Sequence, residues 1–252
     1  MNKLIILGVL GLTLLSPGLV KAQKTISEDE QAWFAVVNTT RLSNRWGIWF
    51  DAHMRLKNDF VQKPSLFILR GGPTYFINND LRLTAAYAFI NVFPETAHPE
   101  VSRPEHRLWQ QVQWFSHIQK ARWMQWIRLE QRYRRNLSDN GLLADGYQFN
   151  WRMRFNGLLT IPLGKDAFKP GGLQGVVNNE LMVNFGKHIR YNYFDQNRFF
   201  VGLGLQTAPS SQLQLGYLNV FVQSPAGDRF SNIHAVRMFY THNFDFRKKT
   251  SS

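Results

Sequence analysis

The sequence predicts an all-β protein, an antiparallel up-and-down transmembrane β-barrel of about 10–12 strands that follows a cleaved signal peptide. Three observations predict this fold class. The chain begins with a short export signal, apolar and polar residues alternate over long runs, and short connections alternate with longer polar ones. We therefore expect a signal peptide over residues 1–22 and a single barrel domain over residues 23–252.

The first 22 residues have the organisation of a secretory signal peptide. Lys3 gives a positive start, residues 4–15 are apolar, and Ser16-Pro17-Gly18 predicts a turn before the small residue Ala22. We expect cleavage after Ala22, which leaves Gln23 as the mature N-terminus. The apolar run is shorter than the roughly 18 residues that a membrane helix needs. The chain has no cysteine, which excludes a lipid-anchored N-terminus and a disulfide framework.

The chain is strongly basic. Its formal net charge of +13 falls to +11 when Lys3 and Lys21 leave with the signal peptide. Such a charge often indicates nucleic-acid binding, but an exported protein rarely meets nucleic acid, and the arginines are spread along the whole chain. We therefore predict no nucleic-acid partner. Outer-membrane lipid and the phosphates of lipopolysaccharide, or small anions inside a pore, explain the charge better.

From Ala32 onward, apolar and polar residues alternate with a period of two, as in strands with one apolar face. The runs last roughly 11 to 16 residues, as tilted membrane strands do, whereas soluble strands average about five or six. Aromatic residues make up 14% of the chain and recur near the ends of the runs, as in the interfacial girdles of membrane barrels. Both features favour a membrane barrel over a soluble β-sandwich. The clearest runs are 46–56, 81–89, 123–134, 147–161, 199–205, 213–217 and 236–246.

The connections differ in length in an alternating order. Compact links at 42–44, 78–80, 119–120 and 208–210 alternate with longer ones at 57–64, 94–104, 135–146, 187–196 and 223–231. Tight turns on one side and longer loops on the other are typical of outer-membrane barrels. Only the link 162–172 is long on the short side. The count is about eleven strands, but bacterial barrels have even numbers. For an even number, either the run Ala32–Thr40 is not a wall strand, or the alternation does not reveal one further strand.

Several segments occur in an order that resembles an uncharacterised family of exported Gram-negative proteins, labelled domain of unknown function 2490. The resemblance covers nearly the whole mature chain. It implies a signal peptide and a barrel, and it brings no known activity, cofactor or catalytic residue. The segments that carry it are Pro104–Gln111, Arg128–Tyr133, Trp151–Arg154, Asn178–Leu181, Phe194–Arg198 and Gly216–Leu218.

Strand parity points nine charged side chains into the barrel, where we predict a lumenal charge network. An ionised side chain that faces hydrocarbon costs a few kcal/mol at the membrane midplane, so these groups should face the lumen. The tight turn at 119–120 pairs the strands on either side, which brings their charges to a similar depth. Bidentate arginine–carboxylate pairs would then brace the wall. The nine residues are Glu105, Arg107, Arg128, Glu130, Arg132, Arg152, Arg154, Glu180 and Arg198.

The predicted inward charges do not balance. Unpaired guanidinium groups cannot sit in a dry core without a large desolvation penalty, so we expect a wet and electropositive lumen. The inward arginines are Arg45, Arg55, Arg82, Arg107, Arg128, Arg132, Arg134, Arg152, Arg154 and Arg198, against the carboxylates Asp51, Glu105, Glu130 and Glu180.

The sequence leaves three interpretations of function open. The first is a structural barrel or a narrow anion-favouring pore in the outer membrane of a Gram-negative bacterium, inserted by the barrel assembly machinery. The second is an outer-membrane lipid-modifying hydrolase, and the third is a soluble periplasmic β-sandwich binding protein. The sequence has no nucleophile elbow and no zinc-protease motif, and the nearest hydrolase set is Ser102 and His98 with Glu95 and Glu100. We predict no catalytic residue, no metal site and no cofactor.

Overall fold

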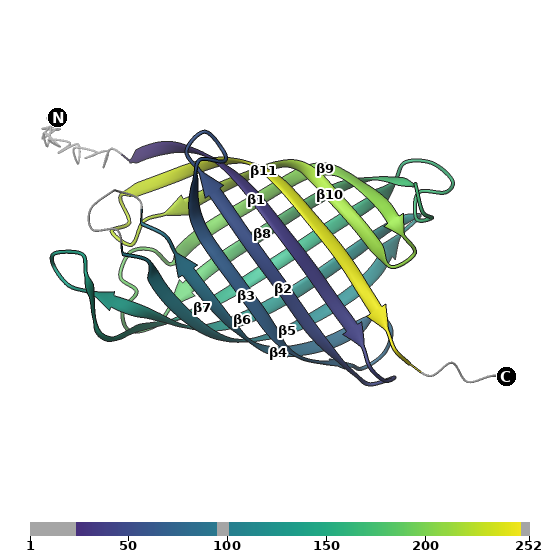
Figure 1. The fold of residues 1–252 in the computed structure, drawn as a ribbon, viewed down its shortest axis with the longest axis horizontal. Coiled ribbons are helices and arrows are strands. Elements are labelled where there is room, and N and C mark those ends of the chain that lie inside the picture. Colours follow the sequence, from purple (N-terminus) through teal and green to yellow (C-terminus); the bar gives the residue numbers. More distant parts are fainter. Residues whose placement is uncertain (1–23, 95–100, 248–252) are drawn as a thin grey trace, which may run out of the picture.

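The computed structural model describes residues 24–94 and 101–247, which form one closed barrel of eleven strands (Figure 1). The predicted all-β barrel is therefore confirmed. The predicted signal peptide and its cleavage site after Ala22 lie outside the described residues. The strands are β1 (Thr25–Arg41), β2 (Trp46–Lys57), β3 (Lys63–Phe76), β4 (Leu81–Val92), β5 (Arg103–Ile118), β6 (Ala121–Leu137), β7 (Leu143–Pro162), β8 (Leu173–Phe185), β9 (Phe194–Ala208), β10 (Ser211–Gln223) and β11 (Arg229–Asp245).

The strand count is odd, which decides how the barrel closes. Each strand pairs antiparallel with its neighbour in the sequence, and β1 then pairs with β11 in parallel, from Thr25 opposite Arg229 to Arg41 opposite Asp245. Eleven antiparallel strands leave the first and the last pointing the same way, so only a parallel pair can close the ring. The expectation of an even number is therefore wrong, because the run Ala32–Thr40 is a wall strand within β1.

The two ends of the barrel carry different connections. At one end, here called the short-turn end, β5 and β6 are joined by two residues, as are β9 and β10. The opposite, long-loop end carries the connections 93–102 and 186–193. Because the strand number is odd, the chain enters at the long-loop end and leaves at the short-turn end (Figure 1). Within the described part of the chain, no helix is long and apolar enough to cross a membrane.

The link 163–172 is the long connection at the short-turn end, and it folds back onto the wall. The amide of Gly171 donates to the carbonyl of Gln206 at 2.8 Å, and the amide of Gln206 donates to the carbonyl of Gly172 at 2.9 Å. A Cβ atom on Gly172 would collide with the carbonyl of Asp166, so the close approach requires glycine there. Phe168 of this link also lines the lumen.

The barrel is apolar outside and largely polar inside. Along β2, Trp46, Ile48 and Phe50 are exposed on the outer surface, whereas Trp49 and Asp51 are buried. Strand β5 repeats the pattern, because its outer side chains include exposed apolar residues and its inner side chains are mostly charged or amide. A buried polar group must find a partner or water, so this arrangement requires a well-bonded interior.

Two apolar clusters also face the interior, so the lumen is not uniformly polar. They lie on different strands and leave most of β6 and β7 to charged side chains. The first spans β1 and β8–β11 with Trp33, Val176, Phe200, Leu218, Val220 and Ala235. The second spans β2–β5 with Trp49, Ile68, Ala86, Ala88, Ile90 and Trp109.

Candidate functional site: an arginine-rich lumen

Glu130 on β6 lies at the centre of the interior charges. It is 1% exposed. Its Oε2 accepts from Nη2 and Nε of Arg152 at 2.6 and 2.9 Å, and its Oε1 accepts from Nη1 of Arg154 at 2.6 Å. A longer contact of 3.5 Å joins it to Arg107. Register creates the first of these pairs, because Glu130 lies directly opposite Arg152 on β7.

Three more carboxylates extend these contacts into a continuous Arg–Glu network. Glu105 accepts from Nε of Arg107 at 2.7 Å and from Nε of Arg132 at 2.6 Å. Glu180 accepts from Arg154, and also from Arg198 at 3.3 Å. Asp195, at the start of β9, accepts from Nη1 of Arg152 at 2.7 Å. The Arg–Glu network thus consists of Glu105, Arg107, Glu130, Arg132, Arg152, Arg154, Glu180, Asp195 and Arg198.

Arg128 is the one predicted network residue that has no hydrogen bond to a carboxylate of the described residues. Its Nε and Nη2 donate to Oε1 of Gln111 at 2.9 and 2.7 Å, and its guanidinium lies 3.9 Å from the ring centroid of Trp109. The nearest carboxylate oxygen, on Glu130, is 3.9 Å from its Nη1. The structure thus places all nine predicted residues inside the barrel, eight of them in the Arg–Glu network.

Sequence reasoning missed some lumenal charges and misplaced one. Arg70 pairs with Asp51 at 2.7 Å, but β3 is apolar on both faces and shows no alternation around it. Asp195 lies in the segment 187–196, for which the sequence predicts a connection, whereas the structure places it in β9. Arg237 has inward parity, and the alternation of β11 was a sufficient signal for it. Arg45 is wrong as a lumenal residue, because it is an exposed turn residue that donates to the carbonyl of Ile77.

The interior encloses a cavity of about 720 Å³. Thirteen arginines line it, against the three carboxylates of Asp51, Glu105 and Glu180. Six of these arginines are hydrogen-bonded to a carboxylate. The other seven have no such bond within the described chain, so the lumen carries excess positive charge. These seven are Arg55, Arg82, Arg103, Arg122, Arg128, Arg134 and Arg237.

Some of these arginines stack on aromatic rings instead of pairing with carboxylates. The guanidinium of Arg55 lies 3.4 Å from the ring centroid of Trp33, and that of Arg237 lies 3.3 Å from Phe200. Phe200 fits there because Gly202 and Gly216 leave room for its ring. Stacking stabilises a cation but satisfies none of its N–H donors. Nε of Arg55 and Arg237 and Nη1 of Arg128 are buried without a hydrogen-bond partner among the described residues.

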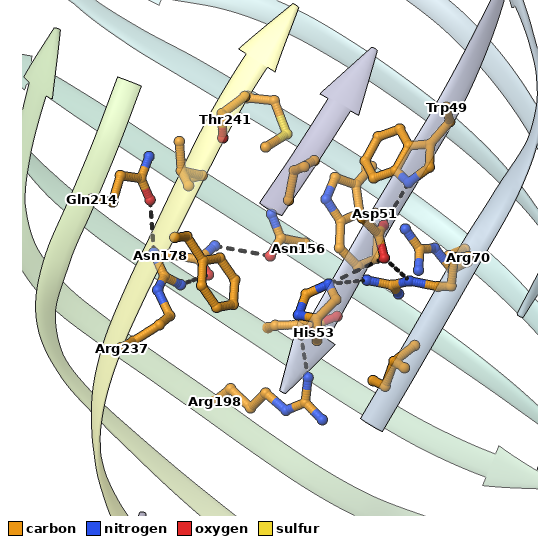
Figure 2. Close-up of a pocket in the computed structure, with 18 of the residues that line it drawn as sticks. Trp49, Asp51, His53, Arg70, Asn156, Asn178, Arg198, Gln214, Arg237 and Thr241 are labelled. Carbon is orange, nitrogen blue, oxygen red and sulfur yellow. Dashed lines mark hydrogen bonds and ion pairs between the residues drawn. The ribbon is translucent and has the colours of Figure 1, made fainter. Parts of the chain in front are cut away.

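Figure 2 shows Asp51, His53 and Arg70 close together, Arg237 across from them, and Arg198 below His53. Asp51 lies 3.2 Å from Nε2 of His53, and Arg70 Nη2 lies 2.8 Å from the same nitrogen. Asp51, His53 and Arg70 therefore form one polar cluster in the cavity wall.

Two other kinds of site, a metal site and a hydrolase site, can be compared with the described residues. Residues 24–94 and 101–247 contain no group of three or more histidines and carboxylates that could hold a metal ion. Of the hydrolase set, Glu95, His98 and Glu100 lie outside the described residues, which leaves Ser102.

The fold and the site define a class: a closed β-barrel with an apolar exterior and an arginine-rich interior. The chain belongs to the family described as "Protein of unknown function (DUF2490)", whose profile matches residues 30–231. The resemblance read from the sequence is therefore confirmed. An uncharacterized protein of Methylorubrum extorquens is 27% identical over 224 residues, covering 84% of this chain and 87% of the relative. No solved structure matches the chain.

Proposed function

We propose that this protein is an outer-membrane β-barrel of a Gram-negative bacterium and that its electropositive lumen admits and binds small anions. One observation carries the proposal: thirteen arginines and three carboxylates line a single cavity of about 720 Å³. Buried guanidinium groups without counter-charges are costly, and anions with water are the species that stabilise them.

The exterior supports the membrane location. Strands β5, β6 and β11 have 16, 17 and 17 residues, as long as tilted membrane strands or longer. Large apolar side chains such as Leu108, Val112, Leu203, Leu215 and Val236 are more than 40% exposed on the outer wall. In water these side chains would be unfavourable, whereas outer-membrane lipid and lipopolysaccharide would solvate them. In this proposal the barrel assembly machinery inserts the chain.

The lining supports passage of anions from the short-turn end. Arg82 and Arg122 line that end together with uncharged polar residues such as Thr39, Ser210 and Asn243. Among the described lining residues of this end there is no carboxylate. A constriction lined by guanidinium groups attracts anions and repels cations.

Reconstitution under a salt gradient tests this function. We expect the refolded protein in a planar bilayer to conduct, with a reversal potential displaced toward the equilibrium potential of chloride. Substituting both Arg82→Gln and Arg122→Gln should reduce the anion preference by about twofold or more, because two positive charges leave a narrow mouth.

The matched control removes two positive charges outside the lumen. Arg190→Gln combined with Arg229→Gln changes two exposed arginines of the long-loop end and should leave the reversal potential unchanged. A cation-selective reversal potential would refute the electropositive lumen. Absence of conductance would replace the pore by a sealed structural barrel.

A further inference from the structure

The cavity has two chemically different sides. The Arg–Glu network lies on β5–β9, which form one side. The other side, formed by β1–β4 and β11, presents seven apolar side chains to the same cavity: Trp49 and six that are here called the apolar wall. It also carries the Asp51–Arg70 pair. This apolar wall consists of Trp33, Val37, Leu66, Ile68, Val92 and Phe239.

Strand register brings parts of the apolar wall together, with His53 between them. Leu66 on β3 lies opposite Val92 on β4, and Ile68 lies opposite His53 on β2. The ring of His53 packs edge-on against Phe239 of β11, with ring centroids 5.3 Å apart. The apolar wall therefore runs across the seam between β1 and β11. The Asp51–Arg70 pair lies beside it, because Asp51 is opposite Val37 in the register.

Positive charge borders the apolar wall. Arg55 projects from the row that also holds Trp33 and Leu66, since Trp33 lies opposite Arg55 and Arg55 opposite Leu66. Arg237 lies opposite Trp33 on the other side. Both arginines have a buried Nε without a partner in the described chain. Two guanidinium groups that line the cavity without a carboxylate partner among the described residues thus flank an apolar surface.

We propose that the lumen selects organic anions that carry an apolar body, such as aryl or alkyl carboxylates, over inorganic anions. This inference rests on the proposed anion-binding lumen and names its ligand class. The carboxylate accepts from Arg55 and Arg237, and the apolar body lies against Val37, Ile68 and Phe239.

Size and solvation favour this class over bare ions. A cavity of about 720 Å³ lies within the range of roughly 300–1,000 Å³ that pockets for small organic molecules have. Such pockets combine apolar and aromatic lining with a few polar groups that fix the orientation. A strongly hydrated inorganic ion gains nothing from the apolar wall, whereas an aryl group removes both its own surface and the wall from water.

Calorimetric titration of the refolded protein in detergent tests whether the lumen prefers organic anions with an apolar body. The heat of titration into empty micelles is subtracted. The probes are 2-naphthoate, acetate, inorganic phosphate and the uncharged 2-naphthalenemethanol. We expect 2-naphthoate to bind at least about tenfold more tightly than each of the other three, because it alone combines both groups.

Two substitutions separate the two contributions. Arg55→Gln should weaken 2-naphthoate binding about tenfold and affect the alcohol much less, since it removes a charge-assisted hydrogen bond. Val37→Thr preserves shape but places a hydroxyl in the apolar wall, so it should weaken both aromatic probes. The controls are Arg190→Gln in a loop and Val36→Thr, which faces outward with 49% exposure and should change nothing.

Three outcomes overturn the ligand class. Acetate or phosphate binding as tightly as 2-naphthoate would leave the anion lumen intact but refute the need for an apolar body. Equal binding of the alcohol and the carboxylate, unaffected by Arg55→Gln, would refute recognition of the charge. Failure of all four probes to bind would refute the site, and the reversal potential would still test the lumen separately.

Discussion

Each carboxylate of the Arg–Glu network contacts more than one arginine, so the loss of a single acidic residue affects several pairs. Glu130 contacts Arg107, Arg152 and Arg154 while being almost completely buried. A buried ion pair adds little net stability compared with apolar packing, but removal of one partner leaves a charge that is neither solvated nor paired. The stability of the Arg–Glu network therefore depends on its few acidic members.

Neutralising the central carboxylate should destabilise the barrel clearly. Glu130→Gln keeps the size of the side chain but leaves Arg152 and Arg154 without their shared counter-charge. We expect the free energy of unfolding to fall by about 3 kcal/mol, or less where lumenal water screens the charges. The measurement is the unfolding temperature, read from the heat-modifiable shift of the protein on a gel.

The matched control neutralises an acidic residue in solvent. Asp139 lies exposed in the connection between β6 and β7, so Asp139→Asn should shift the unfolding temperature by no more than the measurement error. Equal and negligible effects of both substitutions would mean that Glu130 is not buried among arginines.

Residue-level prediction from sequence worked where a strand alternates cleanly. Arg152 and Arg154 sit between outward Trp151, Met153 and Phe155, so parity alone indicates which face they take. Arg70 has no such context, because Leu69 and Ile68 before it are both apolar while only one faces the lumen. Its inward position follows from the pairing of β3 with β2, and the sequence of β3 alone does not reveal that pairing.

At the scale of elements, the parallel pair of β1 and β11 distinguishes this barrel. Parallel pairing is slightly weaker per residue than antiparallel pairing, but seventeen register pairs extend over both strands. Side chains add contacts across the seam: the hydroxyls of Ser27 and Ser231 lie 3.0 Å apart, and Asn38 donates to the carbonyl of His242 at 2.7 Å. Length and side-chain bonds thus offset the weaker geometry.

Cysteine crosslinking tests the seam, because the chain has no cysteine of its own. Ser27→Cys combined with Ser231→Cys places two thiols where hydroxyls lie 3.0 Å apart. Oxidation should form a disulfide in most molecules, since a bridge needs only neighbouring Cβ atoms of suitable direction. The readout is altered mobility of the denatured protein on a non-reducing gel, reversed by reductant.

A control pair of cysteines lies at the same end of the barrel but does not bridge the seam between β1 and β11. Ser27→Cys with Ser138→Cys joins β1 to the connection after β6, on the opposite side of the ring, and should stay reduced. If the Ser27–Ser231 pair also stays reduced under oxidation, β1 does not close the barrel in this register.

At the scale of the whole molecule, the odd strand number separates the two chain ends. The first described residues lie at the long-loop end and the last at the short-turn end (Figure 1). An even-stranded barrel returns both termini to one side of the membrane. This arrangement makes the membrane topology of the proposed outer-membrane barrel directly measurable.

Fractionation and tagging test location and topology together. The chain that begins at Gln23, the predicted N-terminus after cleavage, should fractionate with the outer membrane, and recovery in the soluble periplasm would refute the membrane barrel. With the short-turn end facing the periplasm, an epitope tag after Gln23 should bind antibody on intact cells, whereas a tag after Ser252 should require permeabilised cells. Equal accessibility of both tags would contradict the odd-stranded topology.

The sequence by itself determined the fold class, the approximate strands and the side of the wall that most charges take, because period-two patterning is a property of one strand. It also indicated about eleven strands, but the expectation that bacterial barrels have an even number of strands argued against that count. Only the tertiary structure decided the parallel seam, the partners of Glu130, the inward position of Arg70 and the apolar wall beside Arg55. These features depend on which strands become neighbours and in which register, and that is settled when the ring closes.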